Sequence, residues 1–474
     1  MGWARKLSLP QCAAHSMLPP VTAAPLPADE AELSRALAYL ASFTDWEQLK
    51  PAAAKPFPFG LERMQVLARA LGHPERTRPA IHITGTKGKS GTARFASAIL
   101  TAHGARAFHF ISPHVERVTE RLSIDGRDIT GGEFAALADQ LRPHVEQMRA
   151  SAPELVPTFF EALTAMGFLH ALVADASVLE VGLGGRLDAT NIVQPVASII
   201  TSIGLDHTQI LGSTHDAVAF EKAGIVKRGV PLLLGLHPGD QGFATIAGRA
   251  VELGAPLLHV GRDFVVSRTR LVRRDTSEPQ LAVDGIAAGL PVRDLLLPLG
   301  SRHQALNALL ALAAAALLLR RMGREFDLDR ARAALATASL PARAEWFPDN
   351  PPVLLDGAHT RESVAAIFEL AQQLAAGRPV HALVGLTLER DPVSVFAPLV
   401  DAASVTTTTV PGPRGQSAAD LAEALGGHAI ESPLEALAAA RREARGGVLL
   451  VTGSLYLAGA LRSMLTQEVR RPLS

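Results

Sequence analysis

IHITGTKGKSGT, residues 81–92, is the stretch that decides the fold. Two isoleucines alternate with polar residues over its first four positions, which predicts a short buried strand. Three glycines follow within seven residues, and they let the backbone turn tightly and approach a ligand. We expect a helix over 93–101, whose first backbone N–H groups would point at an anion. The sequence therefore predicts a loop that holds the phosphates of ATP, formed by Thr86, Lys87, Gly88, Lys89, Ser90 and Gly91.

This loop departs from the strict pattern G-x-x-x-x-G-K-[ST], because Ile83 occupies the position of the first glycine. A shorter form, G-T-x-G-K-S, is present at 85–90. Ser90 or Thr92 would supply a hydroxyl for Mg²⁺. The alternative interpretation is a glycine-rich strand–helix turn that carries a surface lysine and binds no nucleotide.

Composition describes a globular protein with an ample core. The 474 residues suffice for two or three domains, and 48% of them are hydrophobic. Lys and Arg balance Asp and Glu at 46 each, which removes any electrostatic argument for nucleic acid or a membrane as partner. The single cysteine, Cys12, excludes an internal disulfide framework and a thiolate metal cluster, so we expect a cytoplasmic protein. The longest apolar run, 308–319, is shorter than the about 20 residues that span a bilayer and predicts a buried helix.

Residues 1–28 contain no acidic side chain and several prolines. We expect them to form a disordered leader. A transit-like peptide is one alternative, and an initiation site assigned too early, with Met17 as the true start, is another.

Strands alternate with helical patterns after residue 29, which indicates a parallel sheet with helices on both faces. Hairpin-like sequence follows at 264–283, a helix at 303–322 closes this unit, and the alternation restarts after 339–343. We therefore predict an α/β fold. A P-loop NTPase-like domain with a doubly wound parallel sheet, residues 29–338, is followed by a smaller Rossmann-like α/β domain, residues 343–474. The predicted strands are 81–84, 106–111, 177–181, 196–203, 353–355, 380–384, 405–410 and 448–451.

Polar side chains fall at the ends of three predicted strands. Ser112, Glu180 and His207 each follow a strand of the P-loop sheet, and ligands of open α/β sheets bind beyond the carboxyl ends of the strands. A hydroxyl, a carboxylate and an imidazole beside a triphosphate suit a Mg²⁺ site, although Mg²⁺ prefers oxygen and the imidazole is the odd member. Taken singly, each residue also has a structural explanation as a helix cap, an ion-pair partner or a local hydrogen-bond donor. Lys222 has one too, as an exposed charge near a helix C-terminus.

Together, the motifs resemble the Mur ligase superfamily and, within it, the folylpolyglutamate synthase/dihydrofolate synthase branch. The resemblance runs from residue 39 to residue 459 and covers nearly the whole chain. Its most specific parts are LEVGLGGRLDATN at 179–191 and TSIGLDHT at 201–208. The other matching motifs are GTKGK at 85–89, ISPH at 111–114, TFFE at 158–161, EKAGI at 221–225, RHQ at 302–304 with Asn307, LDGAH at 355–359 and TGSLY at 452–456.

The resemblance implies roles for the phosphate and metal groups. Lys89 and the loop backbone would hold the β- and γ-phosphates, and Ser112, Glu180 and His207 would bind two Mg²⁺ ions. Lys222 would be carbamylated, which converts a neutral amine into a carboxylate-like metal ligand. Lys89, His207 and Lys222 would be the catalytic residues.

The same resemblance assigns the nucleotide and the pterin. Asn307 would contact adenine, while Arg343 and Asp356 would reach the nucleotide from the domain junction. Phe160 and Asp188 would face the pterin.

For the incoming amino acid, His359 and Ser454 would place glutamate, with Arg121 as a weaker candidate. The implied activity is ATP-dependent amide formation, in which L-glutamate is added to a pteroate or folate carboxylate through an acyl phosphate. ATP and Mg²⁺ would be the cofactors, small molecules the substrates, and a monomer the active form. Whether dihydropteroate, a reduced folate or both serve as acceptor stays open.

Four departures from the family pattern are present. KSGT at 89–92 exchanges serine and glycine, PAR at 341–343 replaces W-P-G-R, Thr360 stands where many bacterial members have asparagine, and LTLERD at 386–391 only loosely resembles a D-K-D region. The alternatives are a Mur-type ligase acting on another carboxylate and a non-catalytic ATP-binding protein. A peptidoglycan ligase is disfavoured because only 84 residues precede Gly85, too few for a whole substrate domain. A signalling GTPase lacks support because no N-K-x-D motif is present.

Overall fold

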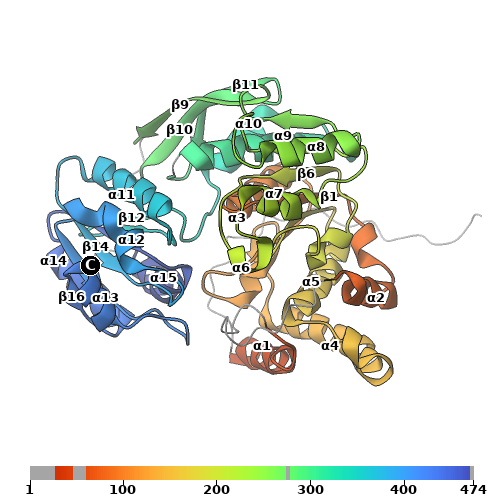
Figure 1. Ribbon diagram of the computed structural model, residues 1–474, viewed down its shortest axis with the longest axis horizontal. Helices are drawn as coiled ribbons and strands as arrows, with labels where there is room; N and C mark the ends of the chain where they lie inside the picture. The colour runs from red at the N-terminus through yellow and green to blue at the C-terminus, as the bar shows by residue number, and fades with distance from the viewer. Residues whose placement is uncertain (1–26, 46–59, 274–277, 301, 470–474) are drawn as a thin grey trace, which may run out of the picture.

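The computed structural model describes residues 27–45, 60–273, 278–300 and 302–469. Three sheets of eight, three and six strands organise this part of the chain (Figure 1). The predicted leader, residues 1–28, lies outside the described residues except for its last two, with which helix α1 (Pro27–Leu40) begins.

The largest sheet has the strand order β4-β3-β2-β5-β1-β6-β7-β8. The strands β2, β5, β1, β6, β7 and β8 pair in parallel, in that order. β3 and β4 extend the edge beside β2 in antiparallel fashion. Every residue of β1 and β5 is buried, as expected for central strands covered on both faces. The strands are β1 (Ala80–Thr84), β2 (Ala107–Phe110), β3 (Leu122–Ile124), β4 (Arg127–Asp128), β5 (Ala176–Glu180), β6 (Ala197–Ile200), β7 (Leu232–Leu234) and β8 (Leu257–His259).

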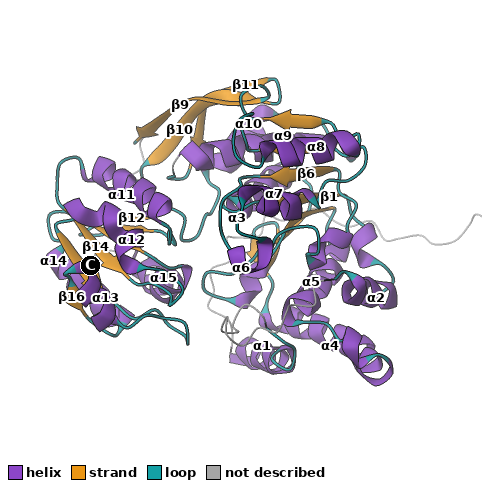
Figure 2. Ribbon diagram, viewed as in Figure 1, coloured by secondary structure: helices purple, strands orange, loops and turns teal. Residues whose placement is uncertain are grey.

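Helices cover both faces of this sheet (Figure 2). α3, α9 and α10 share one hydrophobic cluster with it, and α1, α2, α4 and α5 share the cluster on the other face. The predicted capping boxes at Thr130 and Thr158 are confirmed, since each hydroxyl accepts from the N–H three residues later. The helices before the second sheet are α2 (Glu62–Ala70), α3 (Lys89–Ala102), α4 (Gly131–Ser151), α5 (Phe159–His170), α6 (Thr208–Leu211), α7 (His215–Ala223) and α8 (Phe243–Glu252).

Three boundaries near the predicted site differ from expectation. α3 begins at Lys89 rather than at residue 93, because Gly88 in the left-handed region is its N-cap and Thr92 N already donates to Gly88 O. Glu180 is the last residue of β5 instead of following it. β6 ends at Ile200 rather than at 203, so His207 does not directly follow a strand.

A three-stranded antiparallel sheet lies over α9 (Arg302–Arg321), which in turn packs on α3 (Figure 1). Its strands are β9 (Phe264–Val272), β10 (Gln280–Ala287) and β11 (Leu290–Leu297), so the predicted hairpin is confirmed, whereas the third strand was not predicted. α9 is long and apolar enough to cross a membrane by length and composition, yet 67% of its most apolar window is buried inside the protein. It is therefore the predicted buried helix, and α10 (Leu328–Ala336) follows it.

The C-terminal sheet has the order β12-β13-β17-β14-β15-β16, parallel except for β12. α11 and α12 pack on one face, and α14 and α15 on the other. A doubly wound P-loop sheet followed by a smaller Rossmann-like α/β unit, as predicted, is thus confirmed. Its elements are β12 (Glu345–Phe347), β13 (Val353–Leu355), α11 (Arg361–Ala375), β14 (Val380–Val384), α12 (Pro392–Phe396), β15 (Ser404–Thr407), α13 (Ala418–Leu425), β16 (His428–Ala429), α14 (Pro433–Glu443), β17 (Val448–Thr452) and α15 (Leu455–Val469).

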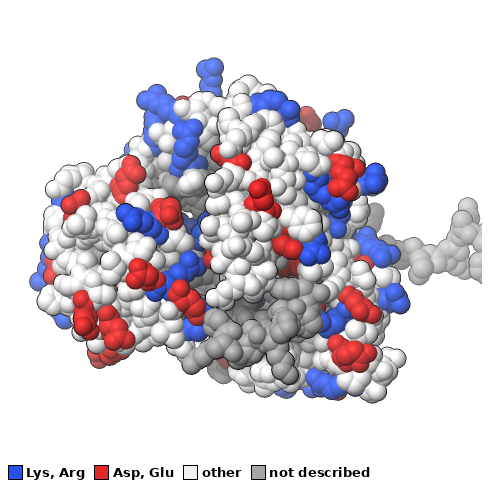
Figure 3. Space-filling view, in the orientation of Figure 1, with Lys and Arg blue, Asp and Glu red and all other residues white. Residues whose placement is uncertain are grey.

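Acidic and basic side chains are interspersed over the face of the molecule in Figure 3. This pattern agrees with the balance of charges in the sequence. Among the described residues, this face therefore carries no extended surface of a single charge sign.

Candidate active site

The predicted phosphate loop joins β1 to α3 at the carboxyl end of the central strand. Gly85 has a φ of +155°, and a Cβ there would lie 1.8 Å from Thr201 Oγ1. Gly88 has a φ of +90°, and a Cβ there would lie 2.6 Å from Asn307 Oδ1. Both positions therefore require glycine, which lets the loop pass between the end of β6 and α9.

The segment after β6 holds the loop in place. Ser202 Oγ accepts from Lys87 N at 2.9 Å, and Ser202 O accepts from Thr86 N at 3.0 Å. Thr86 Oγ1 donates to Gly204 O at 3.1 Å and accepts from Gly204 N at 3.0 Å. The loop backbone is thus fixed before any ligand arrives.

Lys89, the first residue of α3, lies over this loop. Its Nζ donates to Gly85 O at 3.0 Å, which keeps the ammonium beside the turn. The first turn of α3 leaves N–H groups without intrahelical partners, and the helix dipole adds partial positive charge there. The loop, the helix start and Lys89 together form an anion site suited in charge to a phosphate group.

A buried carboxylate connects the loop to the next strand ends. Glu180, 1% exposed, accepts from Ser90 Oγ at 3.0 Å and from Ser112 N at 3.2 Å. Burial raises the pKa of Glu180, although Lys89 and the two donors oppose that shift. Thr92 is instead buried, and its hydroxyl donates to Gly88 O. Ser90 is therefore the P-loop hydroxyl beside the carboxylate, and this oxygen set suits Mg²⁺.

The other two predicted metal groups approach from the segment after β6 and from α7. His207 has a φ of +51°, is exposed, and its backbone N–H bonds Asp206 Oδ1. Lys222 is only 4% exposed, and burial, with the nearby charge of Lys89, lowers its pKa to about 7. Among the described residues no three His, Cys, Asp or Glu side chains converge on one point. A metal ion at Glu180 would therefore complete its shell with other oxygen ligands, such as hydroxyls, waters and phosphate oxygens.

The residue predicted to contact adenine lies against the phosphate loop. Asn307, on α9, is 6% exposed and directly contacts the Gly88 position. Its Nδ2 donates to Gln304 Oε1 at 3.0 Å, and Gln304 approaches Gly91. Gln304 belongs to the RHQ motif, but sequence reasoning gave it no role.

The linker brings the predicted Arg343 and Asp356 together. Asp356 follows β13, and its two carboxylate oxygens accept from Ala344 N and Ala358 N, both at 2.7 Å. Burial raises the pKa of Asp356, and the charge of Arg343 opposes that shift. The Arg343 Nη1 atom lies 3.0 Å from where a Cβ of Gly357 would stand.

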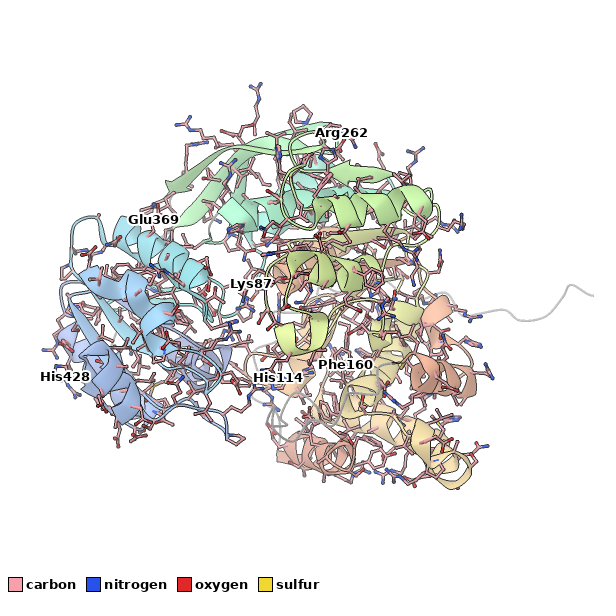
Figure 4. All side chains as sticks on the ribbon, in the orientation of Figure 1. Lys87, His114, Phe160, Arg262, Glu369 and His428 are labelled. Carbon is pink, nitrogen blue, oxygen red and sulfur yellow. The ribbon has the colours of Figure 1, made fainter. Side chains whose placement is uncertain are left out.

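The two residues predicted to face the pterin have different environments. Phe160 packs edge-on against Phe110, with ring centroids 5.8 Å apart, and its ring lies against the backbone of Gly182. Asp188 is buried, and its oxygens accept from Leu183 N and Thr190 N at 3.0 Å. The carboxylate of Asp188 therefore organises its own loop, whereas Phe160 presents a half-buried ring (Figure 4).

The three residues predicted to place the substrate glutamate do not form one cluster of contacts. His359 and Ser454 both follow strands of the C-terminal sheet, β13 and β17. Ser454 is 3% exposed, and its Oγ accepts from Tyr456 N at 3.1 Å. Arg121 is 2% exposed and donates from Nε to His114 Nδ1 at 3.0 Å, in the loop after β2. The contacts of Arg121 thus connect it to the larger sheet.

Several side-chain pairs cross the boundary between the domains, among them Arg462 Nη1, which donates to Glu116 Oε1 at 3.1 Å. Lys87 Nζ lies 3.0 Å from His359 Nε2, and Figure 4 shows Lys87 at the face toward the C-terminal domain. Arg390 donates to Asp206 Oδ1 at 3.1 Å. Sequence reasoning missed the roles of Asp206 and Arg390, although both lie in motifs that it had noted.

A P-loop sheet that closes against a second α/β unit across these residues defines a ligase of the Mur class. The family model for the Mur ligase glutamate ligase domain matches residues 342–455. The folylpolyglutamate synthase of Lacticaseibacillus casei is 32% identical over 85% of this chain and 94% of that protein. The dihydrofolate synthase/folylpolyglutamate synthase of Bacillus subtilis is 31% identical over 86% of this chain and 95% of that protein.

Solved structures agree. The Mycobacterium tuberculosis folylpolyglutamate synthase complexed with ADP and AMPPCP superimposes with a TM-score of 0.80 at 29% identity, and the match covers 92% of this chain and 99% of that chain. The chain belongs to the folylpolyglutamate synthase/dihydrofolate synthase family.

Proposed function

We propose that this enzyme uses ATP to join L-glutamate to the carboxyl group of a pteroate or a folate. The observation that carries the proposal is the meeting of the phosphate loop and the C-terminal domain, with Lys87 Nζ 3.0 Å from His359 Nε2. A phosphorylated carboxylate formed at the loop would therefore face the domain that the family model matches as a glutamate ligase. The names of the relatives supply the substrate class.

The reaction has two steps that balance. A carboxylate oxygen of the pteroate or folate attacks the γ-phosphorus in line, the bond to the β–γ bridging oxygen breaks, and ADP and an acyl phosphate result. The neutral amine of glutamate then attacks the acyl carbon, phosphate leaves with the carboxylate oxygen, and the proton that the nitrogen loses goes to the phosphate or to water. Lys89 and the N-terminus of α3 stabilise negative charge on the phosphates.

Magnesium fits the oxygen ligands present at the carboxylate. Ser90, Glu180 and Ser112 would hold it, and Mg²⁺ bound there supplies charge neutralisation for the phosphates. His207 and carbamylated Lys222 complete the proposed set of catalytic and metal-binding groups. The neutral fraction of Lys222, whose pKa is about 7, makes it a suitable amine for CO₂ addition.

Separate residues serve the nucleotide, the pterin and glutamate in this proposal. Asn307, Arg343 and Asp356 hold the nucleotide. Phe160 and Asp188 serve the pterin, with Phe160 as the direct contact. The residues proposed for glutamate are His359, Ser454 and Arg121.

The proposed domain division follows the sheets. Residues 29–338 carry the nucleotide site, and residues 343–474 carry the glutamate-ligase unit. We further propose that the enzyme works as a monomer in the cytoplasm, which light scattering of the purified protein tests for the oligomeric state.

The decisive assay measures phosphate release from ATP in the presence of Mg²⁺ and L-glutamate. It is run in parallel on 7,8-dihydropteroate and on tetrahydrofolate, and the products are identified by mass spectrometry. Turnover with both acceptors establishes a bifunctional enzyme, and turnover with one assigns the branch. ATP binding without turnover on either would overturn the folate proposal in favour of another carboxylate or of a non-catalytic ATP-binding protein.

A further inference from the structure

Helix α15 contacts the phosphate-loop domain through residues to which the proposed function gives no role. Leu455, Gly459 and Arg462 are spaced four and three residues apart, so they lie on one side of the helix. A Cβ at Gly459 would lie 1.9 Å from Val115 O, in the loop after β2. Val115 and Leu455 both pack against the hydrophobic cluster of the C-terminal unit. This side of α15 therefore docks directly on the loop after β2, and Figure 1 shows α15 at the side of the C-terminal unit that faces the larger sheet.

The guanidinium of Arg462 binds two carboxylates at this contact. Its Nη1 donates to Glu116 Oε1 at 3.1 Å, in the loop after β2. Its Nε and Nη2 donate to the two oxygens of Glu345, on β12, at 2.8 Å each. Glu345 in turn accepts from Ala342 N at 2.9 Å, in the linker between α10 and β12. The three side chains are 19–22% exposed, so water screens these contacts only in part. One guanidinium thus ties α15 to the linker and to the other domain.

The loop after β2 is a fixed support for this contact. The carboxylate of Glu120 accepts from the N–H groups of residues 115, 116 and 117 at 3.0, 2.6 and 2.8 Å. The same loop begins at Ser112, whose N–H donates to Glu180 Oε2 at 3.2 Å, beside the phosphate loop. Arg462 therefore attaches α15 to a segment whose position is set by the phosphate-loop domain.

The first turn of α15 carries a residue proposed to place glutamate. Ser454 directly precedes the helix, its Oγ accepts from Tyr456 N at 3.1 Å, and its O accepts from Ala458 N at 3.1 Å. These bonds make Ser454 part of the helix start. Arg462 lies eight residues further along, a distance of about 12 Å over which an α-helix is a stiff element. The attachment of Arg462 therefore sets the position of Ser454 relative to the phosphate loop.

We propose that Arg462 is a positioning residue, which holds α15 on the loop after β2 so that the glutamate amine, rather than water, reaches the acyl phosphate. The inference rests on the proposed function and adds to it the residue that couples phosphate release to amide formation. When α15 moves away, water enters between the domains and attacks the acyl carbon. The bond to the phosphate oxygen then breaks, the carboxylate is restored with an oxygen from water, and the protons go to phosphate and solvent. ATP is consumed in this way and no amide forms.

A purely structural role for Arg462 is the competing explanation, and the two roles differ in what they leave unchanged. A loss of fold stability lowers the amount of active enzyme, so phosphate release and amide formation fall together. A loss of positioning changes the ratio of the two products. The chain offers a matched pair for comparison, because Arg441 on α14 bonds Asp349 within the C-terminal unit and these side chains are 18% and 20% exposed.

The test measures phosphate and amide product in the same reaction, for the full-length enzyme and its Arg462→Met variant, with dihydropteroate or tetrahydrofolate as acceptor. The wild type should release one phosphate for each amide formed. Arg462→Met should release at least about two, and it should need about five-fold more glutamate for half-maximal amide formation, because partly buried, charge-assisted contacts are lost. Arg441→Met is the control and should keep both values of the wild type.

Glu116→Met covers the case in which Arg462→Met does not fold, because it removes only the contact across the domain boundary and leaves Arg462 bonded to Glu345. It should also raise the ratio of phosphate to amide, and the double variant should be no worse than Arg462→Met alone. A ratio that stays at one in a folded variant, including one whose two rates fall equally, would overturn this inference and leave the proposed function standing. A wild-type enzyme that forms no amide would overturn the proposed function and the inference together.

Discussion

Lys87 Nζ and His359 Nε2 lie 3.0 Å apart across the boundary between the two domains. The other ring nitrogen, Nδ1, lies 2.8 Å from Gly357 O, so the neutral imidazole donates at Nδ1 and accepts from Lys87 at Nε2. Burial, with the charge of Lys87, lowers the pKa of His359 to about 4, which keeps the ring neutral at pH 7. The phosphate loop and the C-terminal domain are thus in direct contact. The loop contacts the ring of His359, which is proposed to place the substrate glutamate.

Removing the Arg390–Asp206 pair across the domain boundary should loosen the closed arrangement. Arg390→Met deletes the donor to Asp206, a pair whose side chains are 29% and 19% exposed. A pair of this kind contributes about 0.5–1 kcal/mol, so the open population should rise about two- to five-fold. Small-angle X-ray scattering of the nucleotide-free protein should show a larger radius of gyration. Arg442→Met, at an exposed position of α14, is the control, and identical scattering from the Arg390 and Arg442 variants would contradict this role.

Lys89→Ala should lower kcat about 1000-fold or more without changing the melting temperature by more than a few degrees. The ammonium is the cation beside the phosphate loop, and the folded state loses only its contact with Gly85 O. Lys227→Ala, whose ammonium bonds Asn191 O instead of the loop, should keep its kcat. Wild-type turnover by the Lys89 variant would refute the assignment of the phosphate loop.

Activity should depend on bicarbonate through Lys222. CO₂ adds only to a neutral amine, and an amine with a pKa of about 7 is mostly neutral above pH 7 and mostly charged below it. Carbamylation should therefore be lost as pH falls through about 7, and stripping CO₂ should lower turnover reversibly. ¹³C NMR in labelled bicarbonate should show a carbamate signal that Lys222→Ala lacks. Full activity in CO₂-free buffer, with no such signal, would exclude the modification.

His109 on β2 should make the fold sensitive to acid. It is 3% exposed, neither ring nitrogen has a partner among the described residues, and burial lowers its pKa to about 3. The folded pKa lies below the unfolded value near 6.5, so the unfolded state takes up the proton first and stability falls as pH drops from 6.5 toward 3. Its contribution to this loss is about 1 kcal/mol at pH 5.5.

His109→Leu should remove this contribution and should also raise the stability at pH 7 by about 1 kcal/mol, because two unpartnered buried nitrogens disappear. Urea unfolding at pH 7 and pH 5.5 measures both effects. His428→Leu, on the exposed edge strand β16, is the control (Figure 4). An unchanged pH dependence in the His109 variant would show that another group causes the acid sensitivity.

The main strands and long helices were predictable because their burial imposes a regular pattern. β1 and β14 are buried along their whole length, and α9 buries most of one long apolar run. β7 and β8 have three residues each, which is too short for any period to appear, and β12 is an equally short antiparallel edge strand. Such strands are recognised only from their neighbours in the sheet.

The site was predictable where side chains follow adjacent parallel strands. Ser112 and Glu180 meet because β2 and β5 are neighbours, and Ser90 joins them from the loop after β1. The role of Arg390 was missed because its contact with Asp206 depends on how the two domains pack, which no local pattern encodes.

The most direct measurement follows ¹⁸O from the acceptor carboxylate of dihydropteroate or tetrahydrofolate, labelled at both oxygens, during turnover with ATP, Mg²⁺ and glutamate. Attack of that carboxylate on the γ-phosphorus and expulsion of phosphate by the amine carry one labelled oxygen into each phosphate released. The account predicts phosphate with one ¹⁸O, formed only when glutamate is present and in step with the amide product. Unlabelled phosphate would mean that water attacks ATP, and it would contradict an acyl-phosphate ligase.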